Sequence, residues 1–174
     1  MLRISPPHII IFFSSTDIKP PILNAFAHCH QLQEVVFPNT LTKLEFNCPC
    51  ALAPSNFGSN LKEITAPNLD IWFNMRVAGN ASSIFYSCPN AKLYIGTNST
   101  PLTKITEDNF PSHITQIPAN LFYNYIALEE VSLPSGVTSI GNSAFYTNSK
   151  NLTVVYIPST VMDMGTSVFY GHEN

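Results

Sequence analysis

The chain has 174 residues, a formal net charge of −3 at pH 7 and only 11% charged residues, less than half of the usual quarter. Its eight Lys and Arg residues are scattered, so no basic stripe is available to neutralise phosphates, and the composition argues against a nucleic-acid partner. An apolar fraction of 45% and this length are sufficient for one continuous hydrophobic core.

The first predicted element is a hydrophobic run near the N-terminus. The five consecutive apolar residues from Ile9 to Phe13 are too few for a membrane span and shorter than the roughly seven to fifteen residues of a secretory signal. Arg3 precedes the run, but no small-x-small cleavage pattern follows it. We therefore expect residues 1–21 to form a strand that covers the first repeat, and residues 22–174 to form a single solenoid domain.

A strand-like phrase then recurs along the chain. Alternation of side chains along a strand places Val131 and Leu133 on one face, and Glu130 and Ser132 on the other. The phrase occurs five times, and its copy at Ala91 is the most altered. The copies are LQEVVFP from Leu32, LKEITAP from Leu61, AKLYIGT from Ala91, LEEVSLP from Leu128 and LTVVYIP from Leu152. We expect each copy to be a short strand with its apolar face toward the core.

A second phrase, apolar-x-x-apolar, alternates with the first. Its copies are Leu41/Leu44, Leu69/Trp72, Leu102/Ile105, Ile114/Ile117, Val137/Ile140 and Val161/Met164. The segments that begin at Val131 and Val155 match with a constant shift of 24 residues. A period in the twenties is typical of a solenoid, in which stacked units bury one continuous core. Spacings of 29, 30, 37 and 24 residues between strand phrases indicate insertions, with Leu102 to Phe110 as a truncated repeat.

These phrases resemble a known repeat family. V-x-x-I-G-N-S-A-F from Val137, together with a cysteine three residues after Phe26 and Phe85, is similar to the BspA-like leucine-rich repeats. The chain departs from that pattern at Tyr125 and Asn148, where the family has cysteine, at Pro118, where it has glycine, and at Ala91, where it has leucine.

The resemblance implies a leucine-rich repeat solenoid of about five to six imperfect units, built mainly of short β-strands with short helical turns. It also implies a surface or secreted protein of a host-associated microbe that binds proteins or adheres to cells. Phe145 should fill the core and stack in a ladder with equivalent phenylalanines of other repeats, namely Phe26, Phe85, Phe122 and Phe169.

The cysteines admit two interpretations. Cys29 and Cys88 occupy the position after the phenylalanine, where the resemblance implies a small buried filler. The alternative is a zinc site, because Cys and His are the ligands that zinc prefers; its candidates are His28, Cys29, His30, Cys48 and Cys50. Since C-x-x-C and H-x-x-x-H spacings are absent, we expect no metal and no cofactor. Whether Cys48 and Cys50 are paired stays open.

The sequence favours a binding function over catalysis. It has no G-x-S-x-G elbow, phosphate loop or H-E-x-x-H motif, so we expect no enzyme. The predicted function is a protein-binding module, adhesive and at the cell surface or extracellular by the resemblance. An intracellular interaction scaffold and a glycan-binding module remain alternatives. A glycan reader should expose several aromatic side chains on one face, whereas the expected strand face offers only Tyr156.

The expected partner-binding surface is the outward face of the strand phrases. Alternation predicts two columns of outward side chains, half of them apolar, which is unusual for a solvent-facing sheet. The first column is Glu34, Glu63, Leu93, Glu130 and Val154, and the second is Val36, Thr65, Ile95, Ser132 and Tyr156.

The last repeat is expected to present an open edge. No further strand phrase follows the strands around Val155 and Val161, and an unpaired strand edge favours association. We expect the chain to be part of a longer repeat array, with packing of this edge against a second copy or a partner chain as the alternative.

Overall fold

The computed structural model describes residues 2–5, 8–12, 17–18, 32–39, 43–46, 60–74, 76–77, 83–86, 88–147 and 150–172. Contacts divide the chain into two compact units, Met1–Pro101 and Leu102–Asn174, here called unit 1 and unit 2. In each unit the described chain passes back and forth between two sheets. The sequence boundary expected at residue 22 stays a prediction.

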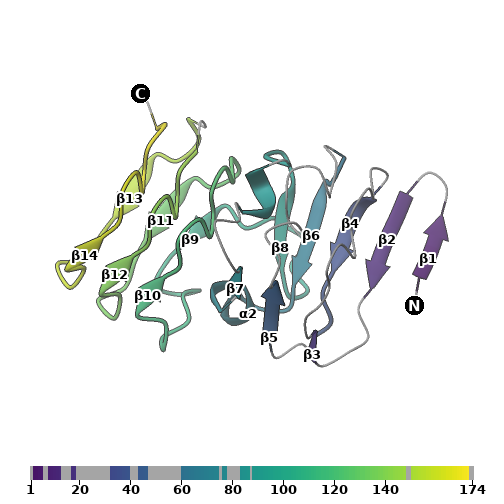
Figure 1. Cartoon of the computed structure of the whole chain (residues 1–174), viewed down its shortest axis with the longest axis horizontal. Coiled ribbons are helices and arrows are strands. Elements are labelled where there is room, and N and C mark those ends of the chain that lie inside the picture. Colours follow the sequence, from purple (N-terminus) through teal and green to yellow (C-terminus); the bar gives the residue numbers. More distant parts are fainter. Residues whose placement is uncertain are drawn as a thin grey trace. The chain divides into compact units, whose positions relative to one another are not determined.

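Unit 1 contains a five-stranded sheet in the order β1-β2-β4-β6-β8 (Figure 1). Its strands are β1 (Leu2–Ser5), β2 (His8–Phe12), β4 (Leu32–Val36), β6 (Glu63–Ala66) and β8 (Lys92–Ile95). β1 pairs with β2 in antiparallel orientation, and the other neighbours are parallel. Residues Ile9 to Phe12 of the N-terminal hydrophobic run thus belong to β2, which lies beside the strand of the first repeat.

The second sheet of unit 1 is smaller. It consists of β3 (Asp17–Ile18), β5 (Lys43–Phe46) and β7 (Arg76–Val77), in that order. Both pairings, β3 with β5 and β5 with β7, are parallel. Parallel neighbours in both sheets are what successive coils of a solenoid produce.

A short helix, α2 (Leu69–Phe73), lies at the second phrase Leu69/Trp72 in unit 1, between β6 and β7. The side chain of Asn68 accepts a hydrogen bond from the Ile71 amide at 2.9 Å, which satisfies one of the amide groups left open at a helix start. Trp72 is fully buried and its ring lies 5.8 Å from that of Phe85, next to the 3₁₀ turn η1 (Ile84–Tyr86). The helix therefore buries its apolar residues in the core of unit 1.

Unit 2 contains two three-stranded parallel sheets. One has the order β13-β11-β9, and the other β10-β12-β14. The strands are β9 (Lys104–Ile105), β10 (Gln116–Ile117), β11 (Glu130–Ser132), β12 (Ser139–Ile140), β13 (Val154–Tyr156) and β14 (Asp163–Met164). Val131 pairs with Val155 and Ile140 with Met164, which confirms the predicted shift of 24 residues and the leucine-rich repeat solenoid.

The core of unit 2 contains the predicted phenylalanine ladder. The rings of Phe122 and Phe145 lie 5.6 Å apart with 6° between their planes, and those of Phe145 and Phe169 lie 5.3 Å apart with 4°. Phe85 belongs to unit 1, and Phe26 lies outside the described residues. The ladder is thus confirmed for three successive coils.

One departure from the repeat pattern is accommodated locally. Tyr125, which stands where the pattern has cysteine, is buried and donates its hydroxyl to the Leu102 carbonyl at 2.6 Å. Cys88 is buried, as predicted for a filler. Cys29 lies outside the described residues.

Glycine is required where consecutive coils approach most closely. A Cβ atom at Gly141 would lie 2.5 Å from the Ala119 nitrogen, and one at Gly165 would lie 2.4 Å from the Asn142 nitrogen. Backbone atoms cannot yield at such distances without a shift of the chain. These two glycines therefore set the spacing between coils of unit 2.

Candidate interaction surfaces

The strand face of unit 1 carries part of the predicted columns in register. Glu34 pairs with Glu63 and Val36 with Thr65 on neighbouring parallel strands. Glu63 is exposed, and the other three side chains are half-buried. These four residues therefore lie in two adjacent columns, and their role in binding a partner stays a prediction.

The column prediction is wrong at the next strand. Leu93 pairs with Ile64, and both side chains are buried, while Ile95 pairs with the buried Ala66. Lys92 and Tyr94 occupy the outward positions in place of Leu93 and Ile95. The pairing is one residue out of step with the predicted alignment, and a slip of one residue exchanges the two faces of a strand.

Two like charges meet on the unit 1 face. Burial raises the pKa of the Glu34 carboxyl, and the nearby charge of Glu63 raises it further. The pKa of the Tyr94 hydroxyl is raised by burial and then by Glu63 and Glu34, which places all three groups in one electrostatic environment. Like charges directly opposite each other destabilise a strand pair, so the two glutamates lower the stability of the pairing between β4 and β6.

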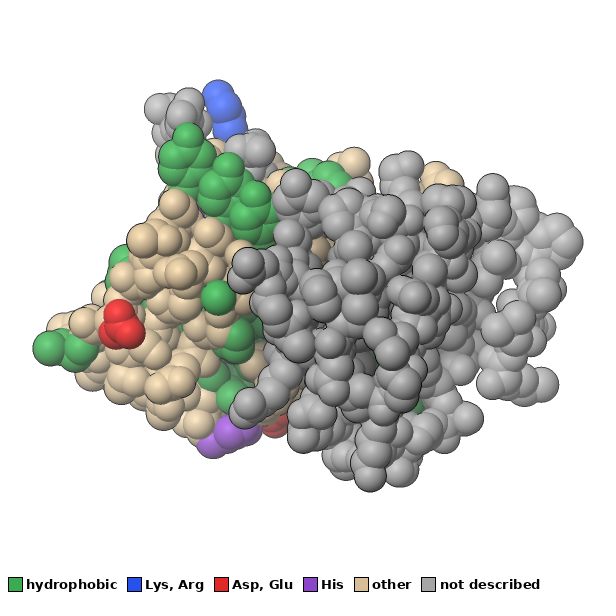
Figure 2. All heavy atoms as spheres, viewed as in Figure 1, with side chains coloured by type: hydrophobic (Ala, Val, Ile, Leu, Met, Phe, Trp, Pro, Cys, Tyr) green, Lys and Arg blue, Asp and Glu red, His purple; other side chains and the backbone are tan. Residues whose placement is uncertain are grey.

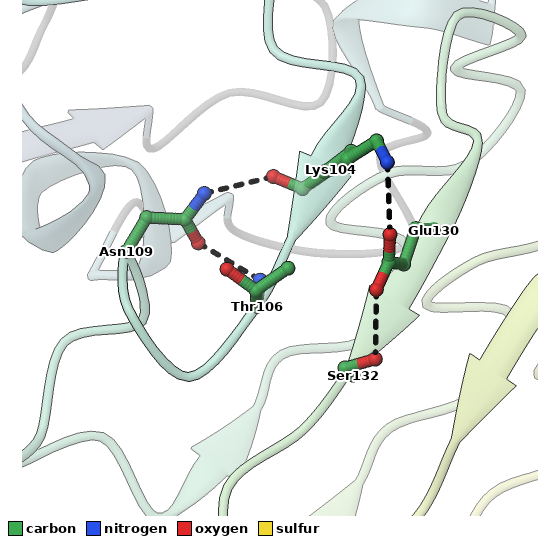
Figure 3. A network of polar contacts seen from close by, with 5 residues as sticks. All are labelled: Lys104, Thr106, Asn109, Glu130 and Ser132. Carbon is green, nitrogen blue, oxygen red and sulfur yellow. Dashed lines mark hydrogen bonds and ion pairs between the residues drawn. The ribbon is translucent and has the colours of Figure 1, made fainter.

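On the unit 2 face the charges are paired (Figure 3). The Lys104 Nζ lies 3.1 Å from the Glu130 Oε2, and the Ser132 hydroxyl donates to the Glu130 Oε1 at 3.3 Å. Asn109 donates to the Lys104 carbonyl at 2.9 Å and accepts from the Thr106 amide at 3.0 Å, which holds the loop after β9 against the strand. This surface therefore offers no unpaired charge at Lys104 or Glu130.

The same face exposes apolar side chains at β13. Val154, in register with Glu130, is 46% exposed, and Tyr156, in register with Ser132, is 59% exposed. The two side chains lie two residues apart on β13 and therefore on the same face of the strand. The unit 2 members of the predicted columns thus lie together: Glu130, Ser132, Val154 and Tyr156.

A row of tyrosines was missed by the sequence prediction. The rings of Tyr123 and Tyr146 lie 4.6 Å apart, and those of Tyr146 and Tyr170 lie 5.2 Å apart, with 5° and 16° between the planes. The signal was present, because each tyrosine directly follows a ladder phenylalanine. Figure 2 shows hydrophobic side chains in a row along the upper edge of the molecule, near the place where Figure 1 marks the C-terminus.

Edge strands β13 and β14 expose residues that are buried in the preceding coil. Within the described residues neither strand has a further neighbour in its sheet. Val155 and Met164 are about half exposed, whereas their register partners Val131 and Ile140 are buried. Met162 is the most exposed of the large hydrophobic side chains described.

The described part of the chain contains no group of three His, Cys, Asp or Glu side chains able to hold a metal ion. The zinc candidates His28, Cys29, His30, Cys48 and Cys50 lie outside it. No helix among the described residues is long and apolar enough to cross a membrane.

Comparison with known proteins identifies the repeats. The model of the BspA type leucine-rich repeat region matches residues 22–103 and 82–174, in six copies. A search of curated protein sequences found no significant match.

The fold resembles that of a solved structure. A leucine-rich cell surface protein from Faecalibacterium prausnitzii is 18% identical with a TM-score of 0.54, over 98% of this chain and 50% of that one. A leucine-rich repeat protein from Bacteroides ovatus is 20% identical with a TM-score of 0.46, over 80% of this chain and 35% of that one. The chain thus spans half or less of the length of these two proteins.

Proposed function

Because the chain belongs to the family of BspA-type leucine-rich repeat proteins, we propose that it binds a protein partner through the outward faces of its parallel strands. Repeat solenoids use such regular surfaces for recognition. The observation that carries the proposal is the exposed pair Val154 and Tyr156 beside the paired charges of Lys104 and Glu130. An apolar centre flanked by satisfied polar groups has the anatomy of a protein contact.

We propose that the strand face of unit 1 also contacts a protein partner. Its candidate contacts are Glu34, Val36, Glu63 and Thr65, extended by Lys92 and Tyr94 from the observed register. The mixture of carboxylates, a lysine and a tyrosine provides specificity more than affinity.

We further propose an adhesive role at the cell surface or outside the cell. The support is the repeat family together with the fold shared with a protein described as a leucine-rich cell surface protein. Accessibility to protease added outside intact producing cells separates this proposal from an intracellular scaffold with the same surface.

The binding proposal is tested with immobilised extracellular-matrix proteins. Val154→Asp and Tyr156→Ala should each weaken binding by tenfold or more, because both truncate or charge the centre of the patch. Tyr170→Ala is a matched control, since Tyr170 and Tyr156 are equally exposed, at 59%. Unchanged affinity of both strand-face variants for every ligand found would show that the surface is wrongly chosen.

A second candidate activity is self-association through the edge of β13 and β14. The half-exposed Val155 and Met164 and the exposed Met162 support it. An unpaired strand edge with apolar side chains is a template for another chain. A second copy is the partner that we propose for this edge.

A further inference from the structure

The three tyrosines of unit 2 form a surface that the proposed strand face does not use. This tyrosine ridge consists of Tyr123, Tyr146 and Tyr170. Tyr123 and Tyr146 are half-buried and Tyr170 is exposed. Each tyrosine directly follows a phenylalanine of the ladder, so the two columns run in parallel, and in each coil the phenylalanine is the less exposed of the two.

The same backbone turn produces the ridge in every coil. Asn120, Ser143 and Ser167 have φ values of 59°, 54° and 55°, and each precedes its ladder phenylalanine by two residues. Such values are uncommon for non-glycine residues other than asparagine, and for serine the surrounding contacts must hold the backbone there. The repeated turn therefore aims three tyrosines in one direction.

Main-chain hydrogen bonds between coils hold the ridge rigid. The Asn124 amide donates to the Tyr146 carbonyl at 2.6 Å, and the Thr147 amide donates to the Tyr170 carbonyl at 3.1 Å. Together with ring stacking, these bonds restrict the tyrosine side chains before any ligand arrives. A preorganised surface binds with a smaller loss of side-chain entropy.

The ridge offers a particular chemistry. Stacking covers the ring faces between neighbours, so the ridge presents ring edges and a row of phenol hydroxyl groups. Among the described residues no further ring stacks on the outer face of Tyr170. The tyrosines themselves are uncharged hydrogen-bonding groups, which suits a neutral, hydroxyl-rich ligand.

The spacing of the ridge distinguishes between polymer ligands. Rings recur every 4.6 and 5.2 Å, whereas side chains on one face of a peptide strand recur every 6.6–6.8 Å or so, roughly two residues. A polyproline helix repeats every ~9.3 Å, or three residues. In an extended polysaccharide, each pyranose unit lengthens the chain by about the width of one sugar ring. This repeat is comparable with the distance between the centroids of neighbouring tyrosine rings.

We propose that the tyrosine ridge binds a neutral polysaccharide, separately from the protein-binding strand face. The phenol hydroxyl groups of Tyr123, Tyr146 and Tyr170 exchange hydrogen bonds with successive sugars. The outer ring face of Tyr170 packs against the C–H groups of one sugar, which meet the negative face of an aromatic ring.

The test uses the whole purified chain with mannan, xylan and cellulose as probes, in pull-down and affinity electrophoresis at raised salt. Binding to at least one probe is expected. Tyr170→Ala should weaken it at least tenfold by removing the outer ring face, and Tyr146→Phe should weaken it by removing one hydroxyl while keeping the stack.

Tyr156→Ala is the matched control and should bind polysaccharide like the parent chain, so that failure of the strand-face proposal and failure of the ridge proposal give different results. Thermal unfolding followed by circular dichroism verifies that the variants are folded. Absence of binding to all three probes overturns the proposal. Binding of Tyr146→Phe and Tyr170→Ala that is as strong as that of the parent chain also overturns it. Loss of a protein ligand in those two variants without any polysaccharide binding also overturns it.

Discussion

Val131 and Val155 are register partners on neighbouring parallel strands, yet Val131 is 0% exposed and Val155 is 45% exposed. Both valines stand at the same place in the repeat and on the same face of their strands. The difference arises because Val131 has a coil on each side, in β9 and β13, while Val155 has a strand neighbour only in β11 among the described residues. Burial in this unit is therefore supplied by the adjacent coil.

The exposed edge leads to a prediction on association. Light scattering over a concentration series should show a mass that rises with concentration, because a second copy covers the edge of β13 and β14. Met164→Asp should lower the association by placing a charge in the contact. Lys150→Ala, a change at an exposed side chain outside both strands, is the control. A mass equal to one chain at every concentration would contradict the prediction.

The phenylalanine ladder predicts a graded loss of stability. Phe145 is buried between two stacked rings, so Phe145→Ala should lower the free energy of unfolding by about 3–5 kcal/mol. Phe169 has one ring of the ladder beside it and is half-buried, so Phe169→Ala should cost less. Denaturant unfolding measures both variants. A fully stable Phe145→Ala chain that no longer binds its ligand would show that Phe145 contacts the ligand.

The close approach of coils predicts opposite outcomes for two glycines. A Cβ at Gly141 would lie 2.5 Å from the Ala119 nitrogen, whereas one at Gly136 would lie 3.9 Å from the Ser112 carbonyl. Gly141→Ala should therefore destabilise unit 2 by about 1–3 kcal/mol through overpacking. Gly136→Ala should be neutral or stabilising by up to about 1 kcal/mol, because alanine restricts the unfolded chain. Equal unfolding free energies for the two variants would refute this explanation.

The paired glutamates predict a pH-dependent gain in stability. A carboxyl with a higher pKa in the folded chain destabilises the fold while it is ionised. For Glu34, whose pKa is raised by burial and by Glu63, this penalty is present above the folded-state pKa. It disappears as the pH falls below the ordinary glutamate value of 4.5.

Glu34→Gln should therefore raise the free energy of unfolding at pH 7 by about 0.2–1 kcal/mol, with the gain shrinking in acid. The measurement is denaturant unfolding at several pH values. Glu107→Gln, at an exposed loop residue of unit 2, is the control and should have little effect. A gain for Glu34→Gln that is the same at pH 7 and in acid would rule out relief of charge as its cause.

Several features were predictable from the sequence because they repeat in step with the coils. Val131 and Val155 recur at a constant interval in the sequence, and parallel stacking places such residues side by side. The same reasoning predicted the stack of Phe122, Phe145 and Phe169. The tyrosines that follow these phenylalanines recur at similar intervals, but the sequence analysis did not predict that they form an exposed row.

The pairing at β8 shows where this reasoning ends. AKLYIGT permits two alignments that differ by one residue, and the observed pairing with β6 is the one that buries Leu93 and exposes Lys92. Because strand faces alternate at every residue, that choice exchanges the core and the surface.

The sequence by itself determined the repeat family, the strand phrases and the aromatic ladder, since periodic residues on parallel coils must meet. The tertiary structure decided which strand positions face outward, that Lys104 and Glu130 form an ion pair, and that the tyrosines form an external ridge. These depend on register, on turn geometry and on contacts between residues more than 20 positions apart. Such contacts exist only after the coils have stacked.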